Sequence, residues 1–381
     1  MTLTNSDIAE LIALRRDLHR SPEVSGQEAG TARRIVDALT PLADEVITRL
    51  GGHGVAAVFV GAGDGPTVLF RCELDALPIA ERSGVPHASE ARGVAHLCGH
   101  DGHMAILAGL GRLMARQRPA RGRVVLLFQP AEETGAGAAD VIADANFDSI
   151  APDYAFALHN RPGLPLGHVG LTDGPIACAS RGMRITFRGK EAHASEPENG
   201  TSPMPAMADL MPALAALSRG ALGDAEFRLA TVTHARLGEP AFGIAPGDGE
   251  VWVTLRTLVD AQMDALCTAA EALAQSAADA HGLVVNWQYE DVFLHSENHP
   301  EATQIAQAAV AALGMSQDGQ GCPMRASEDF GRFGHSAKAA MLYLGSGEVH
   351  PALHNSDYDF PDDLIAIGAR IFDRIARDIL G

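Results

Sequence analysis

Short apolar runs alternate with amphipathic stretches along the first part of the chain. Apolar runs of about four to eight residues predict buried strands, and apolar residues spaced by three and four predict helices. The strands expected here are 55–60, 67–72, 123–128 and 154–158, and the helices are 6–20, 104–116 and 136–144. Asn5 or Ser6 would cap the first helix. Strands alternating with helices predict an α/β domain with a largely parallel sheet.

The middle of the chain follows a different pattern, because its strands alternate polar and apolar residues as half-exposed strands do. The expected order is strand, helix, strand, strand, helix, strand, at 183–187, 203–218, 228–235, 250–257, 263–280 and 283–289. This order is typical of a small ferredoxin-like α+β sandwich. The remaining elements, 301–313, 339–344 and 364–379, return to the first pattern. The sequence therefore predicts an inserted domain, 178–292, within a discontinuous α/β domain formed by 1–177 and 293–381.

Composition and charge narrow the class of protein. The 381 residues include 48 acidic and 29 basic side chains, which give a net charge of −19. This acidic balance argues against a nucleic-acid partner, because nucleic-acid binding needs a basic protein face. No apolar run approaches the ~18 residues of a membrane helix, and the N-terminus lacks the pattern of a signal peptide. Five widely spaced cysteines do not form a disulfide framework. We expect a globular cytoplasmic protein with no membrane partner.

The densest chemical feature is HLCGHDGHMA, residues 96–105, which places Cys98, His100, Asp101 and His103 within six positions. Thiolate, imidazole and carboxylate groups are the usual ligands of zinc and similar divalent ions. The alternative is a polar loop with incidental histidines. Glycines 99 and 102 favour the ligand interpretation, because glycine lets the backbone turn sharply.

Three further segments add candidate ligands at expected strand ends or in loops. FQPAEE (128–133) ends a buried strand in Glu132 and Glu133, of which one acid could bind a metal while the other handles protons. A charged helix start would explain the same pair equally well. ALHN (157–160) and ALHNSDYDF (352–360) supply two histidines. Together the four segments offer enough ligands for two metal ions: Cys98, His100, Glu133, His159 and His354.

Other catalytic motifs fail on inspection. The sequence contains neither H-E-x-x-H nor a phosphate-binding Walker loop, and GAGDGP (61–66) lies between two strands as a turn without dinucleotide-binding spacing. GHSAK (334–338) has Lys338 where a nucleophile elbow needs glycine, which argues against a serine hydrolase.

The motifs as an ordered set resemble the metal-dependent aminoacylase/carboxypeptidase superfamily. The resemblance is to the amidohydrolase branch with hippurate hydrolases, N-acyl-L-amino-acid amidohydrolases and auxin-conjugate hydrolases, and it extends from about residue 12 to 380. The motifs that carry it are RRDLHRSPE, RCELDALPI, HLCGHDGHMA, FQPAEE, ALHNRPGLPLG, GKEAHASEPENG, SEDF and LHNSDYDF. The resemblance implies a dinuclear-metal exopeptidase-like catalytic domain with an inserted lid that also forms a homodimer, or a tetramer.

Carried over by motif, the resemblance implies a role for each candidate residue. Cys98 would bridge two divalent ions (Zn, Mn, Co or Ni), and His100, Glu133, His159 and His354 would complete the ligand set. Glu132 would be the general base, and Asp75 would orient a ligand from behind the metals. His193 of the lid would reach the partner's site and stabilise the oxyanion, and Arg256 would hold the substrate carboxylate.

The activity implied is hydrolysis of N-acyl amino acids, such as N-acetyl or N-benzoyl compounds, by a metal-activated water. A dipeptidase or carboxypeptidase on the same scaffold is the alternative, and a non-catalytic metal-binding protein is a third. The sequence departs from the branch at Glu73, where aspartate is usual, at Gly243, where asparagine is usual, and at the acidic segment 195–198. These departures leave the metal ligands in place and affect the part of the site that selects the substrate.

Overall fold

The computed structural model describes residues 2–224 and 226–381. The chain divides into two compact units, each with its own core. Unit 1 comprises the chain up to Ile176 together with Ser296–Cys322 and Asp329–Gly381, and unit 2 comprises Ala177–His295 with Pro323–Glu328. The short segment Pro323–Glu328 lies in unit 2 because it bonds there: Ala177 forms a β-bridge with Met324, and the Cys178 N–H donates to the Ala326 carbonyl.

Unit 1 is built on an eight-stranded mixed sheet in the order β1-β2-β4-β3-β5-β16-β6-β15. Its centre, from β4 to β16, is parallel, whereas β1 and β2 are antiparallel to their neighbours and β6 is antiparallel to β16. The strands are β1 (Glu45–Leu50), β2 (Gly54–Val60), β3 (Thr67–Glu73), β4 (Arg123–Gln129), β5 (Tyr154–Arg161), β6 (Val169–Gly170), β15 (Gln317–Asp318) and β16 (Lys338–Gly345). A separate pair joins β7 (Gly174–Ala177) and β14 (Ser296–Asn298).

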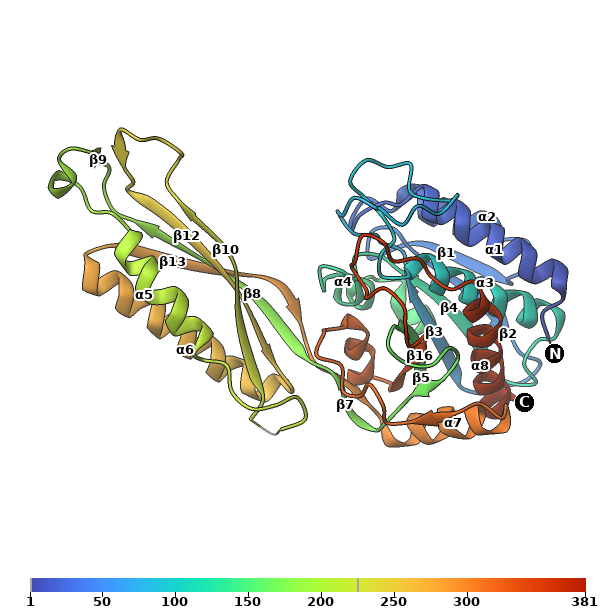
Figure 1. The fold of residues 1–381 in the computed structure, drawn as a ribbon. Coiled ribbons are helices and arrows are strands. Elements are labelled where there is room, and N and C mark those ends of the chain that lie inside the picture. Colours follow the sequence, from blue (N-terminus) through green and yellow to red (C-terminus); the bar gives the residue numbers. More distant parts are fainter. Residues whose placement is uncertain (1, 225) are drawn as a thin grey trace. The chain divides into compact units, whose positions relative to one another are not determined.

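Helices bury both faces of this sheet. One face carries α1 (Asn5–Arg20), α2 (Ala29–Leu39), α3 (His100–Arg116), α7 (Pro300–Ala312) and α8 (Asp363–Leu380), which share one apolar core with the strands (Figure 1). Phe70 of β3 illustrates the packing, because its ring lies 4.8 Å from that of Phe372 and 5.8 Å from that of Phe156. Burial of each such ring stabilises the fold by about 2–3 kcal/mol. The shorter elements are α4 (Gly137–Ala143), η1 (Phe147–Ile150) and η3 (Asp329–His335).

Unit 2 is a four-stranded antiparallel sheet in the order β10-β12-β8-β13, with both helices on one face (Figure 1). Its elements are β8 (Ala179–Arg188), α5 (Met204–Ala215), β10 (Arg228–Leu237), β12 (Asp248–Thr257), α6 (Asp260–His281) and β13 (Val284–Phe293). A small hairpin-like pair, β9 (Ala192–His193) with β11 (Ile244–Ala245), and the turn η2 (Pro197–Asn199) complete it. The order of elements and strands is the predicted ferredoxin-like one.

The structure corrects several details of the predicted secondary structure. The first helix is capped by Thr4, not by Asn5 or Ser6, through a capping box with Asp7. The helix expected from Met104 begins at His100. The prediction also missed α2, although Thr31, Ile35 and Leu39 are buried at helical spacing, and β1, most of whose residues are not buried. The sheet is mixed, not largely parallel, at its edges.

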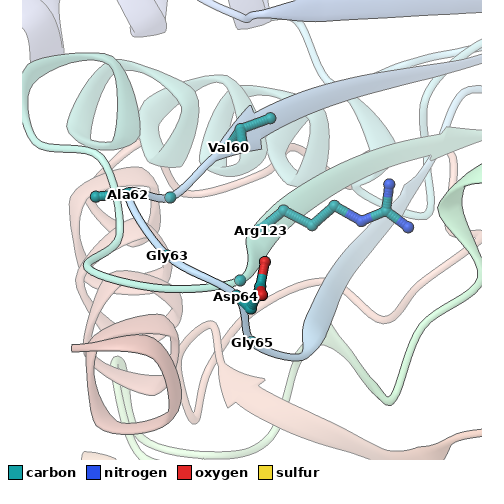
Figure 2. A pocket seen from close by; sticks show the side chains of 8 residues that line it. Val60, Ala62, Gly63, Asp64, Gly65 and Arg123 are labelled. Atoms are coloured by element: carbon teal, nitrogen blue, oxygen red, sulfur yellow. The ribbon is translucent and has the colours of Figure 1, made fainter.

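The glycine-rich turn between β2 and β3 serves close backbone packing. The Gly61 N–H donates to the Gly122 carbonyl, and the Gly122 N–H donates to the Gly63 carbonyl, both at 2.8 Å. A side chain at Gly61 or Gly65 would press on the backbone of Arg121 or Gly122. The turn and the start of β4 line a surface hollow of about 270 Å³ (Figure 2). This hollow lies at the amino end of β3 and β4, the sheet edge opposite to the candidate ligands.

Within the described residues, no helix combines the length and the apolar character that crossing a membrane requires.

Candidate metal centre

The predicted ligands converge at the carboxyl edge of the unit 1 sheet. Asp75 follows β3, the Glu132–Glu133 pair follows β4, and His159 lies near the end of β5. Cys98 and His100 stand at the start of α3, and His354 lies on the loop that precedes α8. In a sheet with a parallel centre, the carboxyl ends of neighbouring strands meet at one edge, so side chains far apart in the sequence become neighbours.

The ligand atoms form three overlapping groups, each with all of its atoms within 4.8 Å of one another. Cys98 shares one group with His100 and His159, and a second with Glu133 and His354. The third group contains His100, Glu132 and Glu133. Cys98 is the only residue that the His100–His159 group and the Glu133–His354 group share. Its sulfur is therefore placed where it could bind two cations at once.

The two buried histidines present the nitrogen that a cation needs. In His100, Nδ1 donates to the Asp75 carbonyl at 2.8 Å, so the neutral ring that a cation would bind carries its lone pair on Nε2. That Nε2 is buried and lies 3.8 Å from a Glu133 oxygen. His159 repeats the arrangement, because its Nδ1 donates to the Asn160 carbonyl and its Nε2 lies 3.4 Å from the Cys98 sulfur. Burial holds the pKa of His159 well below its usual value and keeps the ring neutral.

The electrostatics of the cluster favour a bound cation. Burial raises the pKa of the Cys98 thiol well above its usual value, and the neighbouring Glu133 carboxylate raises it further. A thiol in such surroundings becomes a thiolate only when a positive charge compensates it, which a divalent cation does. The donor set of one thiol, three imidazoles and carboxylates therefore fits a dinuclear centre.

Both glycines of the CGHDG segment are required, but for different reasons. Gly99 precedes α3 with φ 93°, and a Cβ there would overlap the Asn160 side chain. This left-handed turn aims His100 at the site and is the sharp turn expected from the sequence. Gly102 lies inside the helix, where a Cβ would overlap the Phe360 ring. Its role is close packing against the segment that follows His354, and not a turn.

The Glu132–Glu133 pair is held from behind by Asp75, the predicted orienting residue, and by Glu28, for which no role was predicted. Asp75 accepts the Glu133 N–H at 2.9 Å through Oδ2, the oxygen that also accepts the Ser25 hydroxyl at 2.7 Å. Ala131, just before the pair, has φ 51°, a strained value for a residue with a side chain. Its N–H donates at 2.9 Å to Glu28, which is fully buried.

A second buried network lies beside the ligand histidines. His103 bonds to Glu73 through Nδ1 and to Asn160 through Nε2, both at 2.6 Å, and Asn160 donates to the Tyr358 hydroxyl. Glu73 in turn pairs with the guanidinium of Arg71. Neither Glu73, a departure from the resembled pattern, nor His103 of the HLCGHDGHMA motif had a predicted role. Asn160 directly follows the predicted ligand His159, and Tyr358 lies in the same motif as His354. Their positions in these motifs were the sequence signal that could have pointed to a role at the site.

The other two predicted site residues, His193 and Arg256, lie in unit 2. His193 is exposed on β9, and its Nδ1 accepts the Ser195 N–H at 3.2 Å and lies 2.7 Å from the Ser195 hydroxyl. Arg256 on β12 is partly buried, which lowers the pKa of its guanidinium. Its bonds are to neutral groups, the Ser327 hydroxyl at 2.8 Å and the Arg325 carbonyl at 3.4 Å, and among the described residues it pairs with no carboxylate.

A cysteine, three histidines and two carboxylates lie together at the carboxyl edge of an α/β sheet, an arrangement typical of metal-dependent hydrolases. The comparison with protein families agrees with this class. The chain belongs to Peptidase family M20/M25/M40, whose sequence model matches residues 69–378. It is a hydrolase that acts on amide bonds.

Individual relatives extend the comparison. The N-acetylcysteine deacetylase of Bacillus subtilis is 28% identical over 97% of this chain and 97% of its own length. The N-acetyl-L-cysteine deacetylase of the same organism is 40% identical over 206 residues, which are 54% of this chain and about half (49%) of that protein. A solved structure from Bacillus subtilis, described as a dinuclear metal binding peptidase from the M20 family, superposes with a TM-score of 0.81 at 25% identity and covers 99% of both chains.

Proposed function

We propose that this protein hydrolyses the amide bond of N-acyl amino acids, releasing a carboxylate and a free amino acid. The observation that carries the proposal is the arrangement around Cys98, where five candidate ligands form overlapping groups and Glu132 lies beside them. The relatives named as deacetylases of N-acetylated cysteine support the substrate class.

In this proposal the chain divides the work between its two acids. When two divalent cations are bound, they supply the Lewis acidity that activates water and polarises the amide carbonyl. Cys98, His100, Glu133, His159 and His354 would hold the cations. Glu132, which is 5% exposed and adjacent to a ligand, would take the proton of the water and pass it to the leaving amine. Asp75 would fix the orientation of His100.

The lid residues would act on the substrate. The Nδ1 of His193 accepts the Ser195 N–H, which leaves Nε2 as the ring nitrogen that can donate. That N–H is the donor which an oxyanion requires. Arg256, a partly buried guanidinium that bonds to the Ser327 hydroxyl and the Arg325 carbonyl, would bind the carboxylate of the amino acid.

Several finer features belong to the same proposal. The catalytic domain would comprise 1–177 and 293–381, and the lid domain would comprise 178–292. The chain would form a homodimer in which His193 serves the partner's site. The exposed side chains of Phe242 and Ile244, on the segment that pairs with β9, would lie within that assembly. We propose zinc or manganese as the cations and the reducing cytoplasm as the location, because a Cys98 thiolate needs protection from oxidation.

A substrate panel tests the activity. Purified protein loaded with Zn²⁺ or Mn²⁺ should release amino acids from N-acetyl and N-benzoyl amino acids faster than from dipeptides, and a chelator should abolish the release. Faster hydrolysis of dipeptides would favour the dipeptidase alternative. Binding of two cations without turnover of any panel member would favour the non-catalytic one.

The role of Arg256 has its own test. Arg256→Met should lower kcat/KM about 10²-fold for an N-acetyl amino acid but leave the rate with the corresponding amino-acid amide unchanged. Arg184→Met is the matched control, because Arg184 lies on the same sheet and already pairs with Glu290. An equal loss of activity with acid and amide would contradict carboxylate binding by Arg256.

A further inference from the structure

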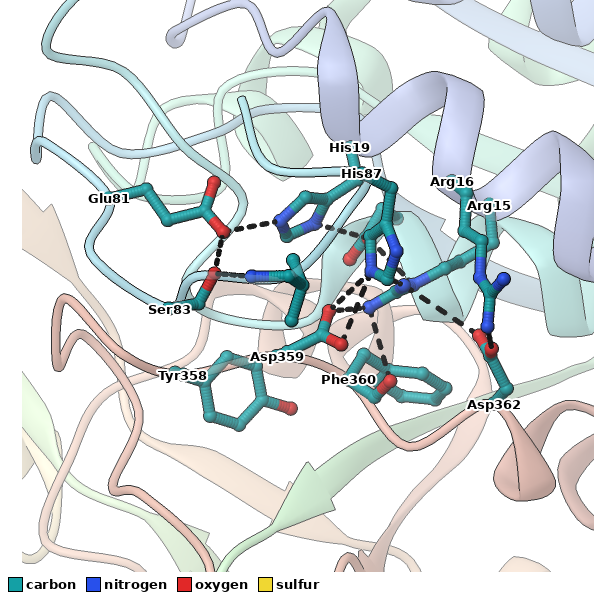
Figure 3. Close-up of polar contacts among 12 residues, drawn as sticks. Arg15, Arg16, His19, Glu81, Ser83, His87, Tyr358, Asp359, Phe360 and Asp362 are labelled. Carbon is teal, nitrogen blue, oxygen red and sulfur yellow. Dashed lines mark hydrogen bonds and ion pairs between the residues drawn. The ribbon is translucent and has the colours of Figure 1, made fainter. Parts of the chain in front are cut away.

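One arginine of the first helix is fully buried among acidic side chains. The side chain of Arg15, in α1, has no exposed surface. Its Nη2 pairs with Asp359 and donates to the Phe360 carbonyl at 3.1 Å, and its Nη1 lies 3.7 Å from Asp362 and 2.7 Å from His87 Nε2 (Figure 3). Its Nε lies 2.9 Å from Asp101. One guanidinium thus faces three carboxylates and a carbonyl, a use of its fixed donor geometry that a lysine cannot reproduce.

The carboxylates that Arg15 joins belong to two different segments, and each segment carries candidate metal ligands. Asp101 follows His100 in the first turn of α3. Asp359 and Phe360 follow His354 on the loop before α8. Arg15 therefore connects the helix that carries His100 to the loop that carries His354.

The two segments differ in how firmly they are otherwise held. His100 is part of a helix and is bonded to the Asp75 carbonyl. His354 lies in a strained loop, with φ 66°, and its backbone N–H donates to the Leu97 carbonyl at 2.8 Å. The Phe360 ring fills the space that a Cβ on Gly102 would occupy, so it packs directly against α3. Without Arg15, Asp101 and Asp359 would lose the positive charge that they share, and among the described residues Asp101 would keep only its contact with His19. The loop is the segment that would yield.

We propose that Arg15 is a positioning residue for the metal centre: by tying Asp101 to Asp359 and Phe360, it fixes the His354 loop so that His354 reaches the group shared with Cys98 and Glu133. The proposal rests on the dinuclear site proposed above. Arg15 lies outside the residues matched by the family model, 69–378, so the match does not account for it.

The proposal predicts an asymmetric effect on metal binding. The group of Cys98, His100 and His159 does not include His354, so the first cation should bind normally to an Arg15 variant. The second cation should bind at least about 10-fold more weakly, the size of effect seen when a residue that orients a ligand is removed.

Titration calorimetry of the metal-free, full-length protein with Mn²⁺ tests this prediction, and Co²⁺ absorption bands report the Cys98 thiolate separately. Arg15→Gln should weaken one of two Mn²⁺ sites at least 10-fold, leave the Co²⁺–thiolate band in place, and lower kcat at limiting metal with KM unchanged. Arg16→Gln is the matched control, because Arg16 pairs with the same Asp362 from the exposed side of the helix at 2.6 Å. It should bind both ions as the wild type does.

A double variant separates positioning from general stability. His354→Ala removes the ligand itself, so adding Arg15→Gln to it should cause no further loss at the second site. Additive losses, or a lowered unfolding midpoint with both affinities unchanged, would overturn the proposal. If Arg15→Gln does not fold, Asp359→Asn removes one pair of the same junction and must show the same asymmetry. Two cations bound without amidase activity would overturn the proposed function alone, whereas fewer than two in the wild type would overturn both.

Discussion

His19 lies one helical turn after Arg15 and gives the buried charge cluster a measurable dependence on pH. Its ring is fully buried, with Nδ1 2.8 Å from Asp101 and Nε2 3.2 Å from Glu81 (Figure 3). A ring with a carboxylate at each nitrogen is satisfied only when both nitrogens carry protons. Burial opposes that charge, but Asp101 and the two hydrogen bonds outweigh it, and the pKa of His19 is raised from 6.5 to about 9.

The direction and size of the effect on stability follow from this pKa. The folded chain holds the proton more tightly than the unfolded chain, so the contribution is complete below pH 6.5 and is lost as the pH rises through 9. A difference between pKa 6.5 and about 9 corresponds to about 3 kcal/mol of unfolding free energy. His19→Gln removes the titrating group, and the variant should therefore lack this pH-dependent part of the stability.

Urea unfolding of the metal-free protein measures the difference. Between pH 6 and pH 10, the unfolding free energy of the wild type should fall by about 3 kcal/mol more than that of His19→Gln. Subtracting the unfolding free energy of His19→Gln from that of the wild type removes the contributions of thiols and other groups that titrate in the same pH range. A constant offset between the two curves across this range would show that His19 is uncharged in the folded protein and would refute the reasoning.

Four further predictions concern the site itself. Glu132→Gln should keep both cations, measured by elemental analysis, and lower kcat at least about 10²-fold; near-normal turnover would exclude Glu132 as the base. Cys98→Ala should reduce the metal content to one ion or fewer, and an unchanged content would contradict a shared ligand. Gly99→Ala should lower the unfolding midpoint far more than Gly282→Ala, which also has a positive φ but open space around its Cβ. Mixed Glu132→Gln and His193→Ala subunits, each inactive alone, should regain activity if His193 serves the partner's site, and confirmed subunit exchange without recovery would argue against it.

The sequence predicted the elements that bury a regular apolar face. The strand 67–72 was predicted from a short apolar run and the helix 263–280 from its long alanine-rich helical pattern, and both lie within a few residues of their observed bounds. Five candidate ligands could be named for a similar reason, since each is a metal-binding residue type at a strand end or in a glycine-rich loop. Local chemistry was sufficient for both.

Features that depend on partners distant in the sequence could not be predicted. Nothing local shows that β2 and β3 pair with β4 on either side instead of with each other. Glu28 resembles any surface glutamate in the sequence, yet it is buried and holds the strained Ala131. Such assignments need the identity of the bonding partner, which is more than 100 residues away here.

The N-terminal motif RRDLHRSPE contains no proposed ligand, but its residues contact the segments that carry the ligands. Arg15 joins Asp101 to Asp359, and the Glu23 carbonyl accepts the Ala76 N–H beside Asp75. Metal ligands on loops have few packing contacts of their own, so their positions must be fixed by groups behind them. A buried arginine supplies this support only as long as its carboxylates stay buried with it, because removing either side leaves an uncompensated charge. The motif and the site are therefore expected to change together, and a chain that loses Arg15 should retain the metal-binding residues and bind the second cation poorly.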